Sequence, residues 1–397
     1  MSTRDVPASR TPRAEDFVGP RNDGADGTRR VRKTVPGDGR GPVRPGVARL
    51  AGLVRAAGVE NAPTGALSRG GQRASGAGRA DGGAFGSSGG IERDGRPDFA
   101  VPVRPGGYAW WYVDALSANG QYGLTIIAFI GSVFSPYYAW AGRRDPQNHC
   151  AVNVALYGPR ARWAMTERGR GAVARDAANL SIGPSSLSWD GDALTIRVDE
   201  ISAPLPRRIR GIVRVIPMGI NPRVFALEEK GAHVWRPIAP RSRVEVDLSV
   251  PDLKWRGDGY LDMNAGDEPL EGGFHRWTWS RAAPLGVVED CRAVCERRAG
   301  PLSLALRFDN SGRVEEIAPP PRAALPKTMW RVERETRSDN GAAHITRGFE
   351  DTPFYSRSLV ATTLLGREVA CMHESLSLDR FARNSVRLML PFRMPRW

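Results

Sequence analysis

The sequence contains few cysteines and almost no lysine. Four cysteines in 397 residues are too few for a disulfide framework, and no apolar segment near Met1 predicts a secretory signal, so a cytoplasmic protein is expected. Cys291 and Cys295 have C-x3-C spacing without a matching pair, which favours buried thiols over a zinc site. Lysine occurs four times against 53 arginines. Because GC-rich coding alone produces such a bias, the formal charge of +14 does not indicate a nucleic-acid partner.

Several catalytic signatures are also missing. The sequence has no G-x-S-x-G turn, no phosphate-binding lysine loop and no glycine fingerprint of a dinucleotide-binding domain. Four histidines (His149, His275, His344 and His373) show no metal-ligand spacing and are expected to be structural or exposed. These absences disfavour hydrolases and nucleotide enzymes, and neither a cofactor nor a metal is expected.

No apolar run is long enough to predict a membrane helix. Residues 124–134 are nearly continuously apolar, but Asn119, Gln121 and Pro136 flank the run. A bilayer crossing needs about 20 predominantly apolar residues. A fully buried strand pair around Gly131 is therefore predicted, and peripheral contact with a membrane through its loop remains an alternative.

Aromatic residues are nearly absent from residues 1–97. This segment has 20 Gly and 8 Pro but no Tyr or Trp, so it cannot bury enough apolar surface to fold. All 11 Trp and all 8 Tyr follow it. Residues 1–97 are predicted to be a disordered, dispensable Gly/Arg/Ala-rich extension. Residues 68–73 resemble the RGG repeats of RNA-binding tails, but a single copy is weak support for RNA binding.

The remaining residues are rich in short β-type runs separated by turn signals. No long helix-period segment interrupts them, and the turns at 189–192 and 309–312 are typical of hairpins. The pattern predicts an all-β protein of antiparallel sandwich or barrel type, with a domain boundary at 267–273. The predicted strands are 108–115, 122–134, 152–157, 161–166, 193–198, 210–216, 244–250, 302–308, 329–335, 354–365 and 386–390.

Residues 259–264 carry the candidate acid. Their period-2 alternation places Tyr260, Asp262 and Asn264 on one face of a strand. A carboxyl group among apolar neighbours resists ionisation and can act as a proton donor near neutral pH. His233 and Trp235 have the same spacing, so two strands could direct an aromatic and a titratable group toward one pocket.

Six motifs resemble acyclic carotenoid 1,2-hydratase, also called hydroxyneurosporene synthase. They lie at residues 106–114, 135–140, 148–153, 233–235, 259–262 and 277–279. The resemblance covers the chain after Pro97 and nothing before it. It implies two tandem lipocalin-like β-barrels, which we expect at 98–268, with the active site, and at 272–397. It also implies hydration of the terminal C1–C2 double bond of neurosporene or lycopene without a cofactor or metal.

The resemblance assigns the catalytic positions to Asp262 with Tyr260 and to His233 with Trp235. Protonation of C2 by Asp262 would leave a tertiary cation at C1, which the aromatic faces of Trp235 and Tyr260 could stabilise. The proton of the attacking water could return to Asp262 directly or pass through His233. Asp114 is the alternative acid. The expected substrate-binding residues, in the barrel core and pocket wall, are Trp110, Tyr112 and Trp277.

Two other functions remain open at this point. Lipocalin-like barrels hold apolar ligands in their mouths, so a non-catalytic carotenoid carrier is the main alternative. An RNA-associated protein with an arginine-rich tail is the other. For the hydratase, the expected partners are an acyclic carotene, water and the surface of an intracytoplasmic membrane, which a basic protein surface favours.

Overall fold

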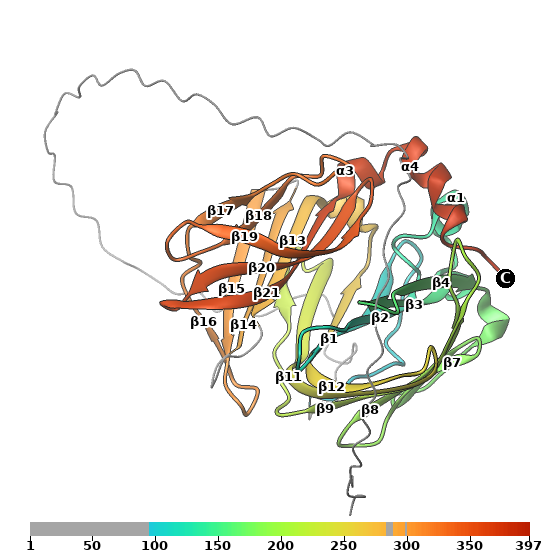
Figure 1. The fold of residues 1–397 in the computed structure, drawn as a ribbon. Helices are drawn as coiled ribbons and strands as arrows, with labels where there is room; N and C mark the ends of the chain where they lie inside the picture. Colours follow the sequence, from blue (N-terminus) through green and yellow to red (C-terminus); the bar gives the residue numbers. More distant parts are fainter. Residues whose placement is uncertain (1–94, 283–288, 298–299) are drawn as a thin grey trace, which may run out of the picture. The chain divides into compact units, whose positions relative to one another are not determined.

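The chain is all-β over the residues that the computed structural model describes, which are 95–282, 289–297 and 300–397. Two antiparallel sheets account for most of them, together with a small two-stranded sheet (Figure 1). Every helix in these ranges has six residues or fewer, which confirms the predicted absence of long helices. Residues 1–94, and with them nearly all of the predicted extension, lie outside the described ranges.

The first sheet has twelve strands in the order β4-β3-β2-β1-β12-β11-β9-β8-β7-β6-β5, with β10 paired to β11. The strands are β1 (Tyr108–Ser117), β2 (Gly123–Ile130), β3 (Cys150–Tyr157), β4 (Arg162–Arg168), β5 (Val173–Arg175), β6 (Asn179–Ile182), β7 (Ser185–Trp189), β8 (Leu194–Ile201), β9 (Arg208–Pro217), β10 (Phe225–Ala226), β11 (His233–Val250) and β12 (Leu253–Gly266).

This sheet curls into a nearly closed barrel. Strands β4 and β8 come together, and Arg168 of β4 forms an ion pair of 2.7 Å with the buried Glu200 of β8. Ser185 donates a hydrogen bond of 2.6 Å to the same carboxylate. Since nearly every strand contributes aliphatic side chains to one buried cluster, the barrel interior is a packed hydrophobic core.

The second sheet has seven strands in the order β16-β15-β14-β13-β21-β20-β19. They are β13 (Phe274–Ala282), β14 (Glu289–Arg297), β15 (Gly300–Phe308), β16 (Val314–Glu316), β19 (Ala343–Asp351), β20 (Tyr355–Leu364) and β21 (Arg367–Ser377), while β17 (Arg322–Leu325) pairs with β18 (Arg334–Arg337). The side chains of Cys291 and Cys295 lie outside the described part of the structure.

Four short α-helices lie at turns and ends of the sheets. They are α1 (Pro136–Trp140), α2 (Leu270–Gly273), α3 (Leu378–Phe381) and α4 (Asn384–Met389). The helix α2 lies between the two sheets in sequence, within the predicted boundary at 267–273. Hairpins join β7 to β8 and β15 to β16 at the two predicted turns, which confirms both of them.

Three strand predictions are wrong. Residues 386–390 belong mostly to α4, because Arg387, Leu388 and Met389 are not branched at Cβ and favour a helix. Residues 329–335 are largely a turn, since Arg331 has a φ of 60° and Thr328 accepts the backbone N–H of Val332. The run around Gly131 forms only one strand, β2, and then the chain turns into α1.

Alternation along the central strands creates two separate environments. On β12, Leu261, Met263 and Ala265 point into the barrel core. Tyr260, Asp262 and Asn264 alternate with them and point outward. The outward face packs with side chains of the second sheet in a second, aromatic-rich cluster. The predicted site face therefore lies outside the barrel interior, against the second sheet.

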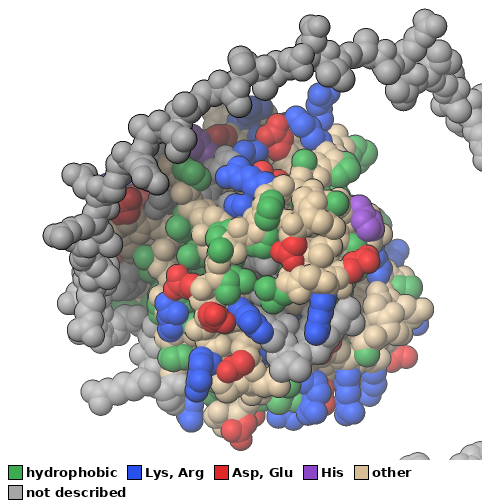
Figure 2. All heavy atoms as spheres, turned by 90° about the vertical axis from the view of Figure 1, so that its left-hand side faces the viewer, with side chains coloured by type: hydrophobic (Ala, Val, Ile, Leu, Met, Phe, Trp, Pro, Cys, Tyr) green, Lys and Arg blue, Asp and Glu red, His purple; other side chains and the backbone are tan. Residues whose placement is uncertain are grey.

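Charged side chains are mixed on the face shown in Figure 2. Lys and Arg side chains alternate there with Asp and Glu side chains among the coloured residues.

Candidate active site

A cavity of about 530 Å³ lies between the outer face of the barrel and the second sheet. Its volume is in the usual range for small-molecule sites. The first sheet contributes Asp262 to its lining, and the chain after α3 contributes apolar residues of its last segment. Many of the lining residues are aromatic: Trp110, Tyr112, Phe129, Trp163 and Trp235 come from the first sheet, and Trp277, Trp279, Phe354 and Tyr355 from the second sheet and its loops.

Asp262 is the buried acid of this cavity. Only 4% of the residue is exposed. Its Oδ2 atom accepts hydrogen bonds of 2.9 Å from Trp235 Nε1 and from the Tyr260 hydroxyl. Burial raises the pKa of Asp262 to about 8, and the negative charges of Glu374 and Asp114 add to the rise, although the two hydrogen bonds oppose it. The group is therefore a neutral carboxylic acid at pH 7.

The hydrogen bonds indicate which oxygen carries the acid proton. Both donors from Trp235 and Tyr260 point at Oδ2, so Oδ2 behaves as the carbonyl oxygen. Asn264 Nδ2 donates a longer hydrogen bond, of 3.3 Å, to the other oxygen, Oδ1, and Asn264 also lines the cavity. Because Oδ2 accepts the two shorter hydrogen bonds, Oδ1 is the favoured position for the acid proton.

Asp114, the alternative acid, has a different environment. It is fully buried, but Arg281 from β13 donates to its Oδ1 through Nε at 2.6 Å and also through Nη2. Arg281 is itself buried. Asp114 thus belongs to a buried ion pair, and it is not among the residues that line the cavity. Asp114 is therefore poorly placed to donate a proton there.

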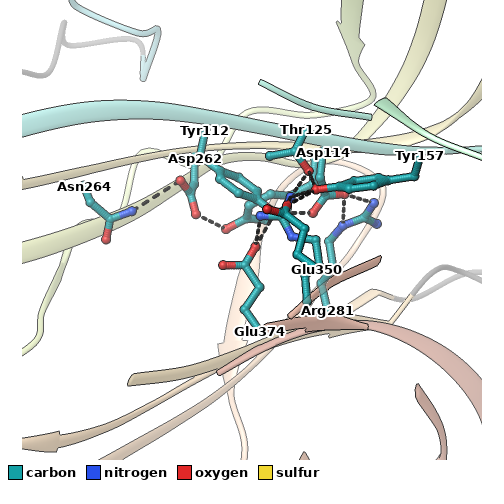
Figure 3. Close-up of polar contacts among 11 residues, drawn as sticks. Tyr112, Asp114, Thr125, Tyr157, Asp262, Asn264, Arg281, Glu350 and Glu374 are labelled. Atoms are coloured by element: carbon teal, nitrogen blue, oxygen red, sulfur yellow. Dashed lines mark hydrogen bonds and ion pairs between the residues drawn. The ribbon is translucent and has the colours of Figure 1, made fainter. Parts of the chain in front are cut away.

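A polar cluster joins the two sheets beside Asp262 (Figure 3). The Tyr112 hydroxyl lies 3.0 Å from Asp114 Oδ2 and 2.7 Å from Glu374 Oε1. Glu374 also accepts a hydrogen bond from Arg357, a buried residue that contacts the Tyr157 hydroxyl at 2.7 Å. Burial raises the pKa of Tyr112 well above its usual value, so its hydroxyl remains protonated.

His233 is not brought to the carboxyl group of Asp262. Its Nδ1 atom lies 2.9 Å from the Tyr108 hydroxyl, and its Nε2 atom lies 3.3 Å from Glu268. Burial lowers the pKa of His233, in opposition to Glu268 and Glu228, so the ring is neutral at pH 7. Tyr108 stacks on Trp110 with 4.9 Å between ring centroids. His233 thus supports the cavity wall through Tyr108.

The other predicted site residues do converge. Tyr260 and Trp235 bond to Asp262, while Trp110, Tyr112 and Trp277 line the cavity. The centroids of Trp110 and Trp277 are 6.4 Å apart, so these residues of different sheets form one aromatic wall.

Sequence patterns did not identify the site residues that the second sheet supplies. Glu374, Arg357 and Trp279 line the cavity, and Arg281 neutralises Asp114. Trp279 could have been found from the sequence, because it lies two positions after Trp277 and shares its strand face. Glu374 and Arg357 carried no such signal, since they meet Tyr112 only through the packing of the sheets.

The last segment of the chain closes one side of the cavity. Leu390, Phe392 and Met394 contribute to its lining. The backbone of Glu167 pairs with this segment through bonds to Pro395 and Trp397, and its buried carboxylate accepts from Arg396. Trp330, Met389 and Phe392 line the cavity and are also 44%, 45% and 82% exposed, so they form an apolar rim at its opening.

Two further observations concern metals and membranes. Among the described residues, no group of three or more His, Cys, Asp or Glu side chains could hold a metal ion. None of the helices in the same ranges is long and apolar enough to span a bilayer.

Comparison with known proteins gives a consistent result. A family model described as carotenoid hydratase CrtC matches residues 126–397. The acyclic carotenoid 1,2-hydratase of Thiocapsa roseopersicina is 56% identical over 92% of this chain and 92% of its own length. The enzyme of the same name from Rubrivivax gelatinosus is 49% identical over 97% of both chains. That from Cereibacter sphaeroides is 43% identical over 68% of this chain and 98% of its own length.

The extension is not outside the resemblance. Alignments that cover 92% and 97% of the chain must include most of residues 1–97, so the expectation of no similarity before Pro97 is wrong for two relatives. Among solved structures, kievitone hydratase from Nectria haematococca is 9% identical with a TM-score of 0.44, over 70% of this chain and 92% of that one.

Proposed function

This chain belongs to the carotenoid hydratase CrtC family, and we propose that it adds water to the terminal C1–C2 double bond of an acyclic carotene by acid catalysis. The observation that carries the mechanism is the neutral, buried carboxylic acid of Asp262 in the wall of an aromatic cavity. A carotene has no polar group near its end, so proton donation to the alkene is the available way to activate it. General acid catalysis typically contributes about 10²- to 10⁴-fold to a rate.

The proposed reaction has two steps. The π electrons of the C1–C2 bond take the proton from Asp262 Oδ1, so the C2–H bond forms and the charge passes to the tertiary carbon C1. Oxygen of a water molecule then bonds to C1 and loses one proton. As Asp262 becomes a carboxylate, Trp235 and Tyr260 stabilise it through the hydrogen bonds that they donate to Oδ2.

The aromatic wall suits the cationic intermediate. Trp110 and Trp277 present π systems from opposite sheets, and Trp235 lies beside the acid. An aromatic face stabilises a desolvated cation by about 2 kcal/mol. The same rings exclude bulk water, which leaves the bound water as the nucleophile. His233, in this proposal, positions the wall through Tyr108 and does not carry the proton itself.

The direct test is Asp262→Asn. The substitution keeps the shape of the side chain but removes the acid, so we expect formation of the 1-hydroxy product to fall at least about 100-fold. Binding should persist, measured as quenching of tryptophan fluorescence by the polyene. A non-catalytic carrier would yield no hydroxylated product even from the unaltered protein, and normal product formation by Asp262→Asn would refute the acid.

We also propose a fold for the second sheet and a site of contact with the membrane. The seven-stranded sheet is taken as a second, open lipocalin-like barrel, a view supported by its purely antiparallel order. The apolar rim of Trp330, Met389 and Phe392 is taken as the site of peripheral membrane contact, since a carotene dissolves in lipid. Exposed Arg331 and Arg393 directly follow Trp330 and Phe392 in sequence and would favour anionic headgroups.

Vesicle flotation tests the membrane contact. Phe392→Glu should weaken sedimentation or flotation with anionic vesicles several-fold, because a charged side chain opposes insertion. Because Phe392 also lines the cavity, activity on detergent-dispersed carotene should be measured in parallel, so that a loss of substrate binding is separated from a loss of vesicle binding. Equal vesicle binding by both proteins would refute the assignment of this rim.

A further inference from the structure

The second sheet places a carboxylate opposite the proposed acid. Glu374 of β21 lines the same cavity as Asp262, and its side chain extends from the second sheet toward the polar cluster (Figure 3). Its negative charge is among the causes of the raised pKa of Asp262, which shows that the two groups interact electrostatically. Besides Asp262, the acidic residues of the lining are Glu350, Asp351 and Glu374. Of these three, Glu374 is among the causes of the raised pKa of Asp262.

The hydrogen bonds of Glu374 leave one oxygen for a further partner. Tyr112 donates to Oε1 at 2.7 Å, and Arg357 donates to the same atom. Over the described residues, no hydrogen bond to Oε2 is present. Glu374 forms an ion pair with the buried Arg357, and its own side chain is 17% exposed, so solvent can reach it.

Trp279 provides a second, independent feature at this place. It lies directly across from Glu374 in the pairing of β13 with β21, so the two side chains share one face of the sheet. Its indole N–H is buried and lacks an acceptor among the described residues, although the ring lines the cavity. A buried donor of this kind normally has a partner, and a water molecule is the simplest one.

We infer that Glu374 is the base that removes the proton from the attacking water and that Trp279 holds the oxygen of this water. This inference rests on the proposed function. When the C1–O bond forms, an O–H bond of the water breaks and its proton passes to Glu374 Oε2. Asp262 has then lost a proton and Glu374 has gained one, so exchange with solvent after product release restores both groups. The active site is complete only with both sheets.

The test uses Glu374→Gln and an anionic nucleophile. Glutamine retains the size and an oxygen acceptor for Tyr112 and Arg357, but it cannot take a proton. We expect hydration to fall about 100-fold or more, while quenching of tryptophan fluorescence by the carotene is unchanged. Azide needs no deprotonation, so adding sodium azide should restore consumption of the carotene and give a 1-azido adduct, detected by mass spectrometry.

Glu350→Gln is the matched control. Glu350 also lines the cavity and carries a carboxyl group near Arg357, at 3.9 Å, but it accepts its hydrogen bond from the Tyr157 hydroxyl and not from Tyr112. This variant should retain hydration within about tenfold, because it removes the same charge without removing the base. Trp279→Phe, which keeps a ring and loses the N–H donor, should lower hydration several-fold and leave carotene binding intact.

The outcomes separate this inference from the proposed function. Hydration by Glu374→Gln at the rate of the unaltered protein would overturn it, as would an inactive but carotene-binding Glu374→Gln that azide does not rescue. In both cases an inactive Asp262→Asn would still support acid catalysis. Asp262→Asn should form neither alcohol nor azide adduct, and product from that variant would overturn the acid mechanism instead.

Discussion

Asp262 and Asp114 are buried on the same outer face of the barrel, yet the groups that surround them differ in charge. Asp114 forms an ion pair with the guanidinium of Arg281, whereas the hydrogen bonds to Asp262 come from the uncharged side chains of Trp235, Tyr260 and Asn264. Burial therefore raises the pKa of Asp262 to about 8. The comparison teaches that burial alone does not make a proton donor; the absence of a cationic partner is also required.

The largest expected effect is on stability, from Asp114→Asn. The substitution removes the buried carboxyl group that pairs with Arg281, and breaking a buried ion pair typically costs about 3–5 kcal/mol. The free energy of unfolding, measured in guanidinium chloride at pH 7, should fall by this amount. Asp262→Asn should cause no comparable loss of stability. Similar losses from both variants would contradict the difference between the surroundings of Asp114 and Asp262.

The stability difference at Asp262 should depend on pH. Because the pKa is about 8 in the folded protein and about 4 in the unfolded chain, the folded state is progressively penalised as pH rises from 4 to 8. Asp262→Asn lacks this penalty. It should match the unaltered protein near pH 4 and be more stable by a few kcal/mol at pH 9, in parallel denaturation series. Equal free energies of unfolding for the two proteins at both pH values would contradict the raised pKa of Asp262.

Activity should follow the protonated form of Asp262. The rate of hydration is expected to be steady below the pKa of about 8 and to fall about tenfold for each further pH unit, measured with substrate well below saturation. Trp235→Phe removes a hydrogen bond to the charged form, so the falling limb should move to higher pH. A limb that moves to lower pH would contradict the role of this indole.

The smallest effect should come from the aromatic wall. Trp277→Leu removes one face from the cavity but leaves both acidic residues in place, so we expect kcat/KM to fall about 10- to 30-fold. Trp255→Leu is a suitable control, because Trp255 packs against the barrel core and is not part of the lining of the cavity. A larger loss from Trp255→Leu would argue against the cationic intermediate.

The sequence predicted the acid and its strand well. The period-2 pattern at 259–264 correctly placed Tyr260, Asp262 and Asn264 on one face, because strand alternation is a local property. It could not predict that this face lies outside the barrel. Which side of a strand faces the interior depends on how the sheet curls, and both faces of β12 are buried.

Long-range contacts account for the remaining errors. Arg281 and Glu374 reach β1 from sequence distances of 167 and 262 residues, and no local pattern encodes such contacts. His233 was grouped with Trp235 because of its spacing, but it lies at the position across from Gly266 and bonds to Tyr108. The strand predicted at 386–390 failed because short apolar runs fit a helix equally well.

The alternation of β1 also matters for engineering. Within ten consecutive residues, every second side chain belongs to the packed barrel core, and the others lie on the outer face that packs with the second sheet. Trp111 and Val113 could be redesigned to change heat tolerance without altering the chemistry. Trp110 and Tyr112 could be varied to accept polyenes of other lengths or end groups. The two properties are thus encoded on one strand and can be optimised separately.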